Sequence, residues 1–272
     1  MSEKRTYCSL CGNVLKIKQN FCPLCSTTKI NISLELYEKL NMDSLREKVQ
    51  KESRAAKQIE IGKQEVLNGQ CVDAVKSFKA ATLINPHSIE AWKNLGLLLR
   101  DMNKFDKSIG AFEEILKNDP NNWFAWQNLG FIYNSTKELD KSINAFKEAI
   151  DIKPEMETSW NALGYLYISK EEYIESIKAL KKALSINTEY SLAQRNLILA
   201  YYKSGDYLNA ETETKDLINK EPQKAGLWYV FAKILYKRGN LKEALRNCVY
   251  CLEIMPDFPN ALKLKEKLLN RI

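Results

Sequence analysis

The sequence predicts an all-α protein, an α-solenoid of six helix-turn-helix repeats closed by one further helix, with a small cysteine-rich head at its N-terminus. Three residue types recur on one 34-residue period. The prolines on this lattice are Pro86, Pro120, Pro154, Pro222 and Pro256, the glycines are Gly62, Gly96, Gly130 and Gly164, and the tryptophans are Trp92, Trp126, Trp160 and Trp228. Chance does not align three residue types on one period, so the chain is an array of repeats.

The composition agrees with this fold. Ten glycines and seven prolines in 272 residues are fewer than a loop-rich β-protein needs. A single histidine excludes metal sites that need two, and leaves only His87 for any Cys–His or Ser–His–Asp arrangement. Because His87 follows Pro86 at a repeat junction, we expect it to be a solvated loop residue.

Each repeat divides into two amphipathic halves. In residues 123–154, Leu129, Gly130 and Tyr133 share a face of the first half, and apolar residues of the second half recur at spacings of three and four. Gly69, Gly205 and Gly239 lie in the turn between halves, where a residue that tolerates positive φ is needed. The lattice glycines are instead in mid-helix, where glycine costs about 1 kcal/mol. We therefore expect the partner helix to approach closely at these glycines.

These residues resemble the tetratricopeptide repeat, whose pattern is W-x2-L-G-x2-Y followed by A, F, A and P over 34 residues. Six repeats fit the pattern, at about 52–87, 88–121, 122–155, 156–189, 190–223 and 224–257. The first repeat has Gln58 for the tryptophan, the fifth has Gln194 and Ile198 for the tryptophan and glycine, and the sixth has Ala232 for the glycine. Weakened terminal repeats are expected, because they cap the stack.

The resemblance implies that the first helix of each repeat lines a concave groove that binds a peptide segment of a partner protein. Asn94, Asn128 and Asn196 share one place in the repeat, and in the family such asparagines hydrogen-bond the backbone of an extended peptide. The neighbouring groove positions are Lys63, Lys93, Arg100, Phe124, Phe131, Asn134, Tyr165, Arg195, Tyr202, Tyr229, Lys233 and Tyr236. An aromatic-lined groove with scattered positive charge suits an acidic-aromatic peptide. The alternative is that the aromatics pad the solenoid and the asparagines make contacts between repeats.

Some proteins of this family hold a C-terminal carboxylate with a set of Lys, Asn and Arg residues across three repeats. With Asn94 as the middle residue, Lys63 fits one place, but Phe124 and Asn128 replace the required cations. The clamp is not present, which argues against a receptor for chaperone tails.

The N-terminal head carries two CxxC knuckles, Cys8-x2-Cys11 and Cys22-x2-Cys25, with ten residues between them. Two such turns can direct four thiolates at one tetrahedral Zn²⁺, and four protein ligands leave no open position for catalysis. Residues 1–30 are too few to build a core, so the metal would supply folding energy. The head, with a short strand expected at 14–18, resembles a zinc ribbon. The alternatives are a reduced cysteine-rich tail or a redox dithiol.

Cys248 and Cys251 form a third CxxC, but they occupy second-helix positions that are buried in other repeats. We expect two small buried thiols in a packing interface. Cys71 is expected to be a free thiol in a turn.

Two segments flank the repeats. Residues 31–51 are expected to join the head to the array as a helical extension, with Asp43 as N-cap of a helix from Ser44 to Leu67. Residues 258–272 are expected to form a capping helix whose Leu262 and Leu269 cover the last repeat.

The N-terminus has no apolar core of the kind that a secretory signal needs, and no apolar stretch is long enough to span a bilayer, so we expect a cytoplasmic protein. The net charge of +7 lies at the two ends, in residues 1–30 and 259–272. We expect a non-enzymatic adaptor that binds a protein or peptide, with a structural zinc ribbon as a second contact and no small-molecule substrate. The alternative is a nucleic-acid- or ribosome-associated factor whose Lys16 and Lys18 meet phosphates. Neither a Gly-rich phosphate loop nor a nucleophile motif appears, which argues against an enzyme.

Overall fold

The computed structural model describes the backbone of residues 5–8, 14–15, 29–32 and 42–272, and the side chains from residue 47 onward. The chain divides into two compact units, Met1–Ala125 and Trp126–Ile272, and each is described by itself.

The first unit begins with a three-stranded antiparallel sheet in the order β2-β1-β3. Its strands are β1 (Arg5–Cys8), β2 (Val14–Leu15) and β3 (Lys29–Ile32). Tyr7 pairs with Val14, and Cys8 pairs with Lys29. The strand expected at 14–18 is thus confirmed for its first two residues, and the rest of it lies outside the described residues.

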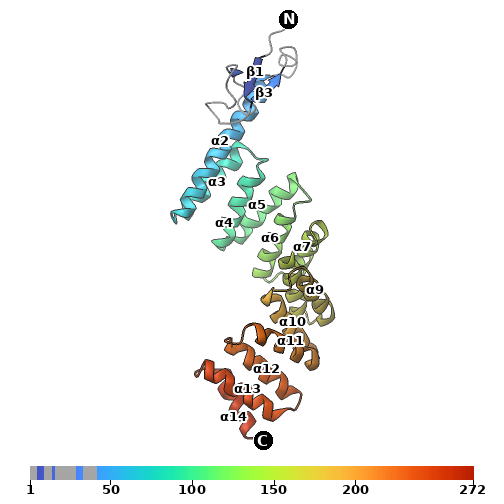
Figure 1. The fold of residues 1–272 in the computed structure, drawn as a ribbon. Helices are drawn as coiled ribbons and strands as arrows, with labels where there is room; N and C mark the ends of the chain where they lie inside the picture. Colours follow the sequence, from blue (N-terminus) through green and yellow to red (C-terminus); the bar gives the residue numbers. More distant parts are fainter. Residues whose placement is uncertain (1–4, 9–13, 16–28, 33–41) are drawn as a thin grey trace. The chain divides into compact units, whose positions relative to one another are not determined.

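The helices of the first unit follow in consecutive antiparallel pairs (Figure 1). They are α2 (Met42–Leu67), α3 (Cys71–Ile84), α4 (Ile89–Asp101), α5 (Phe105–Asn118) and the start of α6 (Trp123–Ser135). The helix expected from Ser44 begins two residues earlier, at Met42, so Asp43 lies in its first turn and not at its N-cap.

The second unit continues this succession. It holds the rest of α6 and α7 (Leu139–Ile152), α8 (Glu157–Ser169), α9 (Tyr173–Ile186), α10 (Ser191–Ser204), α11 (Tyr207–Lys220), α12 (Ala225–Lys237), α13 (Leu241–Ile254) and α14 (Pro259–Leu269). Helices α7 to α13 each pack against the next helix along the chain, and α8 also packs against α10. The described part of the chain beyond the strands is therefore an all-helical solenoid, as the repeat lattice predicts.

The lattice glycines are where the two helices of a pair meet most closely. A Cβ at Gly96 would lie 2.9 Å from Phe112, and a Cβ at Gly164 would lie 2.5 Å from Leu180. The same relation joins Gly62 to Phe78 and Gly130 to Phe146. In each case the large side chain sixteen residues later packs onto bare backbone and is fully buried or nearly so. The expected close approach is confirmed.

The two repeats that lack this glycine have smaller partners. Ile198 stands at the glycine position of the fifth repeat, and the residue sixteen later is Thr214. Ala232 stands there in the sixth repeat, and its counterpart is Cys248. All four are buried. The volume lost on one helix is therefore regained on the other, which keeps the interior close-packed.

The tryptophans and prolines of the lattice form a hydrogen-bonded pair. The indole nitrogens of Trp92, Trp160 and Trp228 each donate to the carbonyl of the proline six residues earlier, at 2.8 Å in all three cases. In the fifth repeat both partners change together, to Thr188 and Gln194. Gln194 is buried and donates instead to Glu213 on α11.

The turns between paired helices also follow the lattice. Gly69, Gly205 and Gly239 have φ of 76°, 86° and 82°, which confirms their expected role. The corresponding residues of the second, third and fourth repeats, Asn103, Lys137 and Glu171, adopt the same left-handed conformation.

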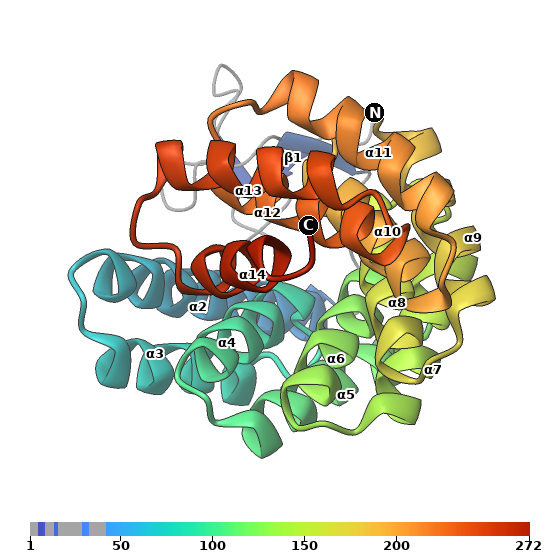
Figure 2. The same ribbon diagram turned by 90° about the horizontal axis from the view of Figure 1, so that it is seen from below.

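The last helix presents a different face from the expected one. Ala261 and Leu268 of α14 are fully buried, whereas Leu262 and Leu269 are 46% and 57% exposed. The prediction that Leu262 and Leu269 cover the last repeat is therefore wrong. Figure 2 shows α14 beside α12 and α13, and the small side chain of Ala261 lets it approach them closely.

Cys248 and Cys251 are free thiols without exposed surface, which confirms the prediction of a packing role. Burial raises the pKa of Cys248 to about 11, so it stays protonated at neutral pH. Cys71 is free as expected and half-buried, but the prediction that it lies in a turn is wrong, because it is the first residue of α3. His87 is exposed as expected, and its Nδ1 lies 2.6 Å from Asn118 Oδ1.

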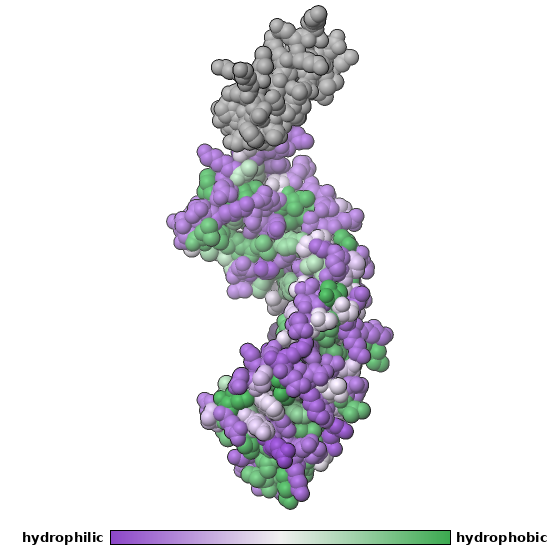
Figure 3. All heavy atoms as spheres, viewed as in Figure 1, coloured by the Kyte–Doolittle hydropathy of each residue, from purple (hydrophilic) through white to green (hydrophobic). Residues whose placement is uncertain are grey.

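On the side of the molecule that Figure 3 shows, hydrophilic residues surround smaller hydrophobic patches. Among the described helices, none combines the length and the apolar character needed to cross a membrane.

Candidate peptide-binding surface

Two first helices of neighbouring pairs, α10 and α12, bring several predicted groove residues together. Helical periodicity places Arg195 and Tyr202 on one stripe of α10, and Gly226, Val230 and Lys233 on one stripe of α12. The stripes meet at both ends. Arg195 and Val230 line a common pocket, and Lys233 lies over the ring of Tyr202. We call this the α10–α12 surface.

Lys233 is the central charged group of the α10–α12 surface. Its Nζ lies 4.8 Å from the ring centroid of Tyr202 and 5.7 Å from that of Tyr229. Aromatic faces attract a cation at these distances. Within the described part of the chain, no carboxylate forms an ion pair with Lys233 and no group accepts a hydrogen bond from its Nζ.

Burial is the main factor that lowers the pKa of Lys233, and repulsion from Lys203 and Lys237 adds to it. Burial likewise raises the pKa values of Tyr202 and Tyr229, so both phenols stay neutral. The surface thus presents a half-buried cation with further positive charge nearby. An anionic group would offset the repulsion between Lys233 and its neighbouring lysines, and it would accept hydrogen bonds from the Nζ of Lys233.

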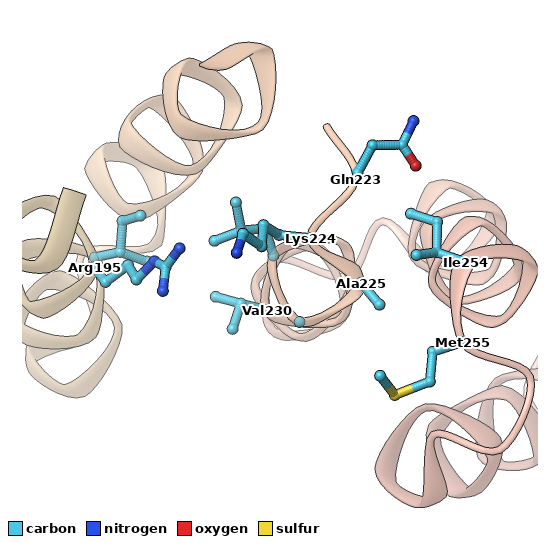
Figure 4. A pocket seen from close by; sticks show the side chains of 10 residues that line it. Arg195, Gln223, Lys224, Ala225, Val230, Ile254 and Met255 are labelled. Carbon is cyan, nitrogen blue, oxygen red and sulfur yellow. The ribbon is translucent and has the colours of Figure 1, made fainter. Parts of the chain in front are cut away.

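A pocket of about 460 Å³ lies beside the first turn of α12. Figure 4 shows Arg195 reaching from α10 on one side, Lys224 and Val230 at α12, and Ile254 and Met255 on the other side. Gly226 opens this pocket, because no atom lies within 4 Å of the position that its Cβ would occupy. The walls are mostly apolar, and the Arg195–Glu221 ion pair stands at the edge. The pocket can therefore take an apolar side chain next to a polar rim.

Two more predicted residues extend this region toward α14. The ring of Tyr229 lies 5.2 Å from that of Phe258, between centroids. Tyr236 lies beneath two cations, Lys267 Nζ at 5.1 Å and the Arg271 guanidinium at 5.5 Å from its ring centroid. Two basic residues near the C-terminus, Lys267 and Arg271, thus lie against an aromatic ring of α12.

The asparagines of the predicted ladder have local partners. Asn128 is only 3% exposed. Asn196 Nδ2 donates to Asn161 Oδ1 at 2.8 Å, and Asn94 Nδ2 donates to the backbone of Glu90 at 2.9 Å. The contact between repeats that was the alternative interpretation is thus present for Asn196.

The other predicted residues of the second unit lie on α6 and α8. Phe131 packs edge-on against Phe146, with ring centroids 5.0 Å apart. Tyr165 is 44% exposed, and Asn134 is half-buried.

The predicted groove residues of the first unit form a separate set. Lys63 Nζ pairs with Glu90 at 2.7 Å, Arg100 pairs with Asp101 at 3.0 Å, and Lys93 Nζ lies 4.6 Å from the ring centroid of Phe124. Lys63 and Asn94 line a pocket of about 340 Å³ with apolar residues of α2 and α4. Here Lys63, unlike Lys233, has a carboxylate partner.

Sequence reasoning missed the pocket at Gly226, although a signal exists. The residues at 34-residue intervals before it are Leu192, Thr158, Phe124 and Glu90, all with side chains. A glycine at this one place marks where a side chain is withdrawn from the surface. Ile254 and Met255 could not be found in this way, because their place depends on how α13 ends beside α12.

The four predicted zinc ligands, Cys8, Cys11, Cys22 and Cys25, lie outside the residues whose side chains are described. Among the residues that are described, no group of three or more His, Cys, Asp or Glu side chains could hold a metal ion.

Three family models of the tetratricopeptide repeat match residues 89–122, 111–144 and 157–190. The chain therefore contains tetratricopeptide repeats. No curated protein matches the sequence.

Several solved structures have the same fold as this chain. A tetratricopeptide repeat protein from Parabacteroides merdae superposes with a TM-score of 0.66 at 22% identity, covering 79% of this chain and 85% of its own. YrrB, described as a TPR protein with an unusual peptide-binding site, has a TM-score of 0.64 at 19% identity, covering 71% and 99%. PilF of Pseudomonas aeruginosa has a TM-score of 0.65 at 16% identity, covering 80% and 99%. The tetratricopeptide repeats that the family models match indicate a scaffold for protein–protein interaction.

Proposed function

We propose that this protein is a non-enzymatic scaffold whose α10–α12 surface binds an extended peptide segment of a partner protein. The observation that supports the proposal best is Lys233, a half-buried cation between Tyr202 and Tyr229 that has no carboxylate partner among the described residues. Leaving a charge partly desolvated in this way is costly unless a ligand completes its environment. YrrB, a TPR protein described as having an unusual peptide-binding site, shares the fold.

The spacing of the surface favours a peptide over a compact small molecule. Gly226 and Lys233 are seven residues apart on α12, which corresponds to about 10 Å along the helix. A ligand that reaches both the pocket and Lys233 must span this length. An extended peptide does so with about three residues.

Peptides selected from a random display library on the full-length protein test this proposal. Because Tyr202 flanks Lys233, Tyr202→Ala is expected to weaken binding of the selected peptides about tenfold, as measured by titration calorimetry. Tyr250→Ala is the matched control, because it removes an exposed aromatic ring from the second helix of a pair, where Tyr250 stacks on Trp228. Equal binding to the wild type and both variants would exclude the α10–α12 surface as the binding site.

We also propose that the N-terminal head binds one structural Zn²⁺ through Cys8, Cys11, Cys22 and Cys25 and gives the scaffold a second contact surface. Four thiolates are a donor set that suits tetrahedral zinc. The pairing of Tyr7 with Val14 brings together the two ends of the segment that contains Cys8 and Cys11, as a knuckle requires. When bound, the metal would supply folding energy that so short a segment lacks.

Metal analysis of the purified protein tests the zinc site. We expect about one zinc per chain and close to none in Cys22→Ser. Cys71→Ser is the control, since Cys71 is a free, half-buried cysteine on α3. A wild-type protein without zinc, or a Cys22→Ser variant that retains it, would refute this assignment.

A further inference from the structure

The α10–α12 surface carries enough chemical detail to define the kind of segment it would bind. This inference rests on the proposed function and narrows it to a sequence class of ligand. Two features carry it, the hydrogen-bonding capacity of Lys233 and the shape of the pocket at Gly226.

We propose that the bound segment carries an acidic side chain that pairs with Lys233 and, about three residues away, an apolar side chain that enters the Gly226 pocket. The segment would lie extended along α12, between α10 and the end of α13.

The charge at Lys233 supports the acidic partner. An ammonium group has three N–H donors, and none of them is satisfied by a described residue. The rings of Tyr202 and Tyr229 hold the ammonium in place without accepting a conventional hydrogen bond. A carboxylate would accept these bonds and offset the repulsion from Lys203 and Lys237.

The other cations nearby differ from Lys233 in one of two ways. Arg195 already pairs with Glu221, and Lys215 pairs with Glu211. Lys203, Lys224 and Lys237 are exposed to solvent, whereas Lys233 is half-buried between two aromatic rings. Lys233 is therefore the cation of this surface best placed to select an acidic residue.

The pocket supports the apolar partner. Ile254 and Met255 are 37% and 46% exposed, so together they offer apolar surface to a ligand at the pocket. In Figure 4 they lie on one side of the first turn of α12 and Val230 lies on the other, and all three line the pocket together with Gly226. An apolar side chain that enters here would cover all three residues. The open rim at Lys224 leaves the backbone of the segment in contact with water.

Two variants separate the two contacts without threatening the fold. Lys233→Met keeps the apolar stem between the tyrosine rings and removes the charge. Gly226→Leu fills the pocket, and its Cβ meets no atom within 4 Å. Gly110→Leu is the matched control, because Gly110 also lies within a helix and has nothing within 4 Å of its Cβ position. All variants are compared at equal folded fraction by circular dichroism.

The probe is a synthetic peptide of the sequence most enriched in the display selection, amidated at its C-terminus. We expect Lys233→Met, and separately the exchange of the peptide's acidic residue for its amide, to weaken binding about tenfold. The two changes together should weaken it no further than either alone, and Lys233→Arg should restore most of the affinity. Gly226→Leu should also weaken binding about tenfold, and Gly110→Leu should not.

The failures of the two proposals can be told apart. Peptides that depend on Tyr202 but tolerate loss of their acidic residue, or tolerate Gly226→Leu, would overturn this inference and leave the peptide-binding scaffold intact. Binding only with a free C-terminal carboxylate would also overturn it. Binding that is indifferent to Tyr202→Ala would overturn both.

Discussion

Replacing Gly96 by Ile is expected to lower the free energy of unfolding by about 2–3 kcal/mol, because the new side chain overlaps Phe112. The Cβ alone would lie 2.9 Å from the Cζ of that ring, and Phe112 is fully buried and cannot swing into solvent. Replacing Phe112 by Thr is expected to cost about 3–5 kcal/mol, because it leaves a cavity above Gly96.

The combined variant is the decisive one. Gly96→Ile with Phe112→Thr reproduces the Ile198–Thr214 pair of the fifth repeat. It should therefore lose at least about 1 kcal/mol less than the sum of the two single variants. The threonine hydroxyl can bond the carbonyl one turn earlier, as Thr214 does with Ala210 at 2.6 Å. Urea unfolding followed by circular dichroism measures the three variants, and strictly additive losses would contradict the size-matching explanation.

Arg238→Met is expected to destabilise the second unit by about 1–2 kcal/mol at neutral pH, because it removes one of two cations that contact a buried carboxylate. Glu211 on α11 pairs with Arg238 and, at 2.7 Å, with Lys215. The cost stays below that of a fully buried pair, since Arg238 is 39% exposed and Lys215 remains.

Glu211 also predicts the dependence on pH. Burial opposes its ionisation, but hydrogen bonds from Lys215 and Arg238 outweigh burial and lower its pKa. A carboxyl group with a lowered pKa contributes stability above its unfolded pKa and loses it as the pH falls through the folded value. The gap between wild type and Arg238→Met should therefore be largest near pH 7 and shrink below about pH 4.

A second change gives the control. The residues at 34-residue intervals from Glu211 are Val75, Ile109, Ile143, Ile177 and Leu245, all apolar. Glu211→Ile added to Arg238→Met should recover most of the lost stability and abolish the difference between pH 7 and pH 4, since packed apolar residues can replace a buried ion pair. Thermal unfolding at both pH values measures this, and a double variant less stable than Arg238→Met would disprove it.

The lattice made much of this architecture predictable. The glycine, tryptophan and proline of the lattice recur because each has a contact inside its own repeat. Gly96 contacts the ring of Phe112, and Trp92 donates a hydrogen bond to the carbonyl of Pro86. Their regular spacing in the sequence therefore reflects the regular spacing of the helix pairs. The turn glycines were predictable for the same reason, since a positive φ is a local requirement.

The face of α14 was not predictable in this way. The helix carries two apolar stripes, Ala261–Leu264–Leu268 and Leu262–Leu269, and periodicity alone favours neither. The choice depends on the surface that α12 and α13 offer, where the small Ala261 permits close contact. The burial of Asn128 likewise depends on neighbours that its own spacing does not reveal.

The size-matched pairs lie inside single repeats, since Gly96 and Phe112 belong to one helix pair, as do Ile198 and Thr214. Each repeat therefore contains both residues of its size-matched pair. A repeat could be duplicated, deleted or transplanted without disturbing its interior. Contacts such as Asn161–Asn196 and Glu211–Arg238 instead join neighbouring repeats, so moving one repeat alone would break them. The fifth and sixth repeats, which carry the α10–α12 surface, are joined by the Glu211–Arg238 ion pair. A duplication or deletion that preserves this ion pair would have to move the two repeats together.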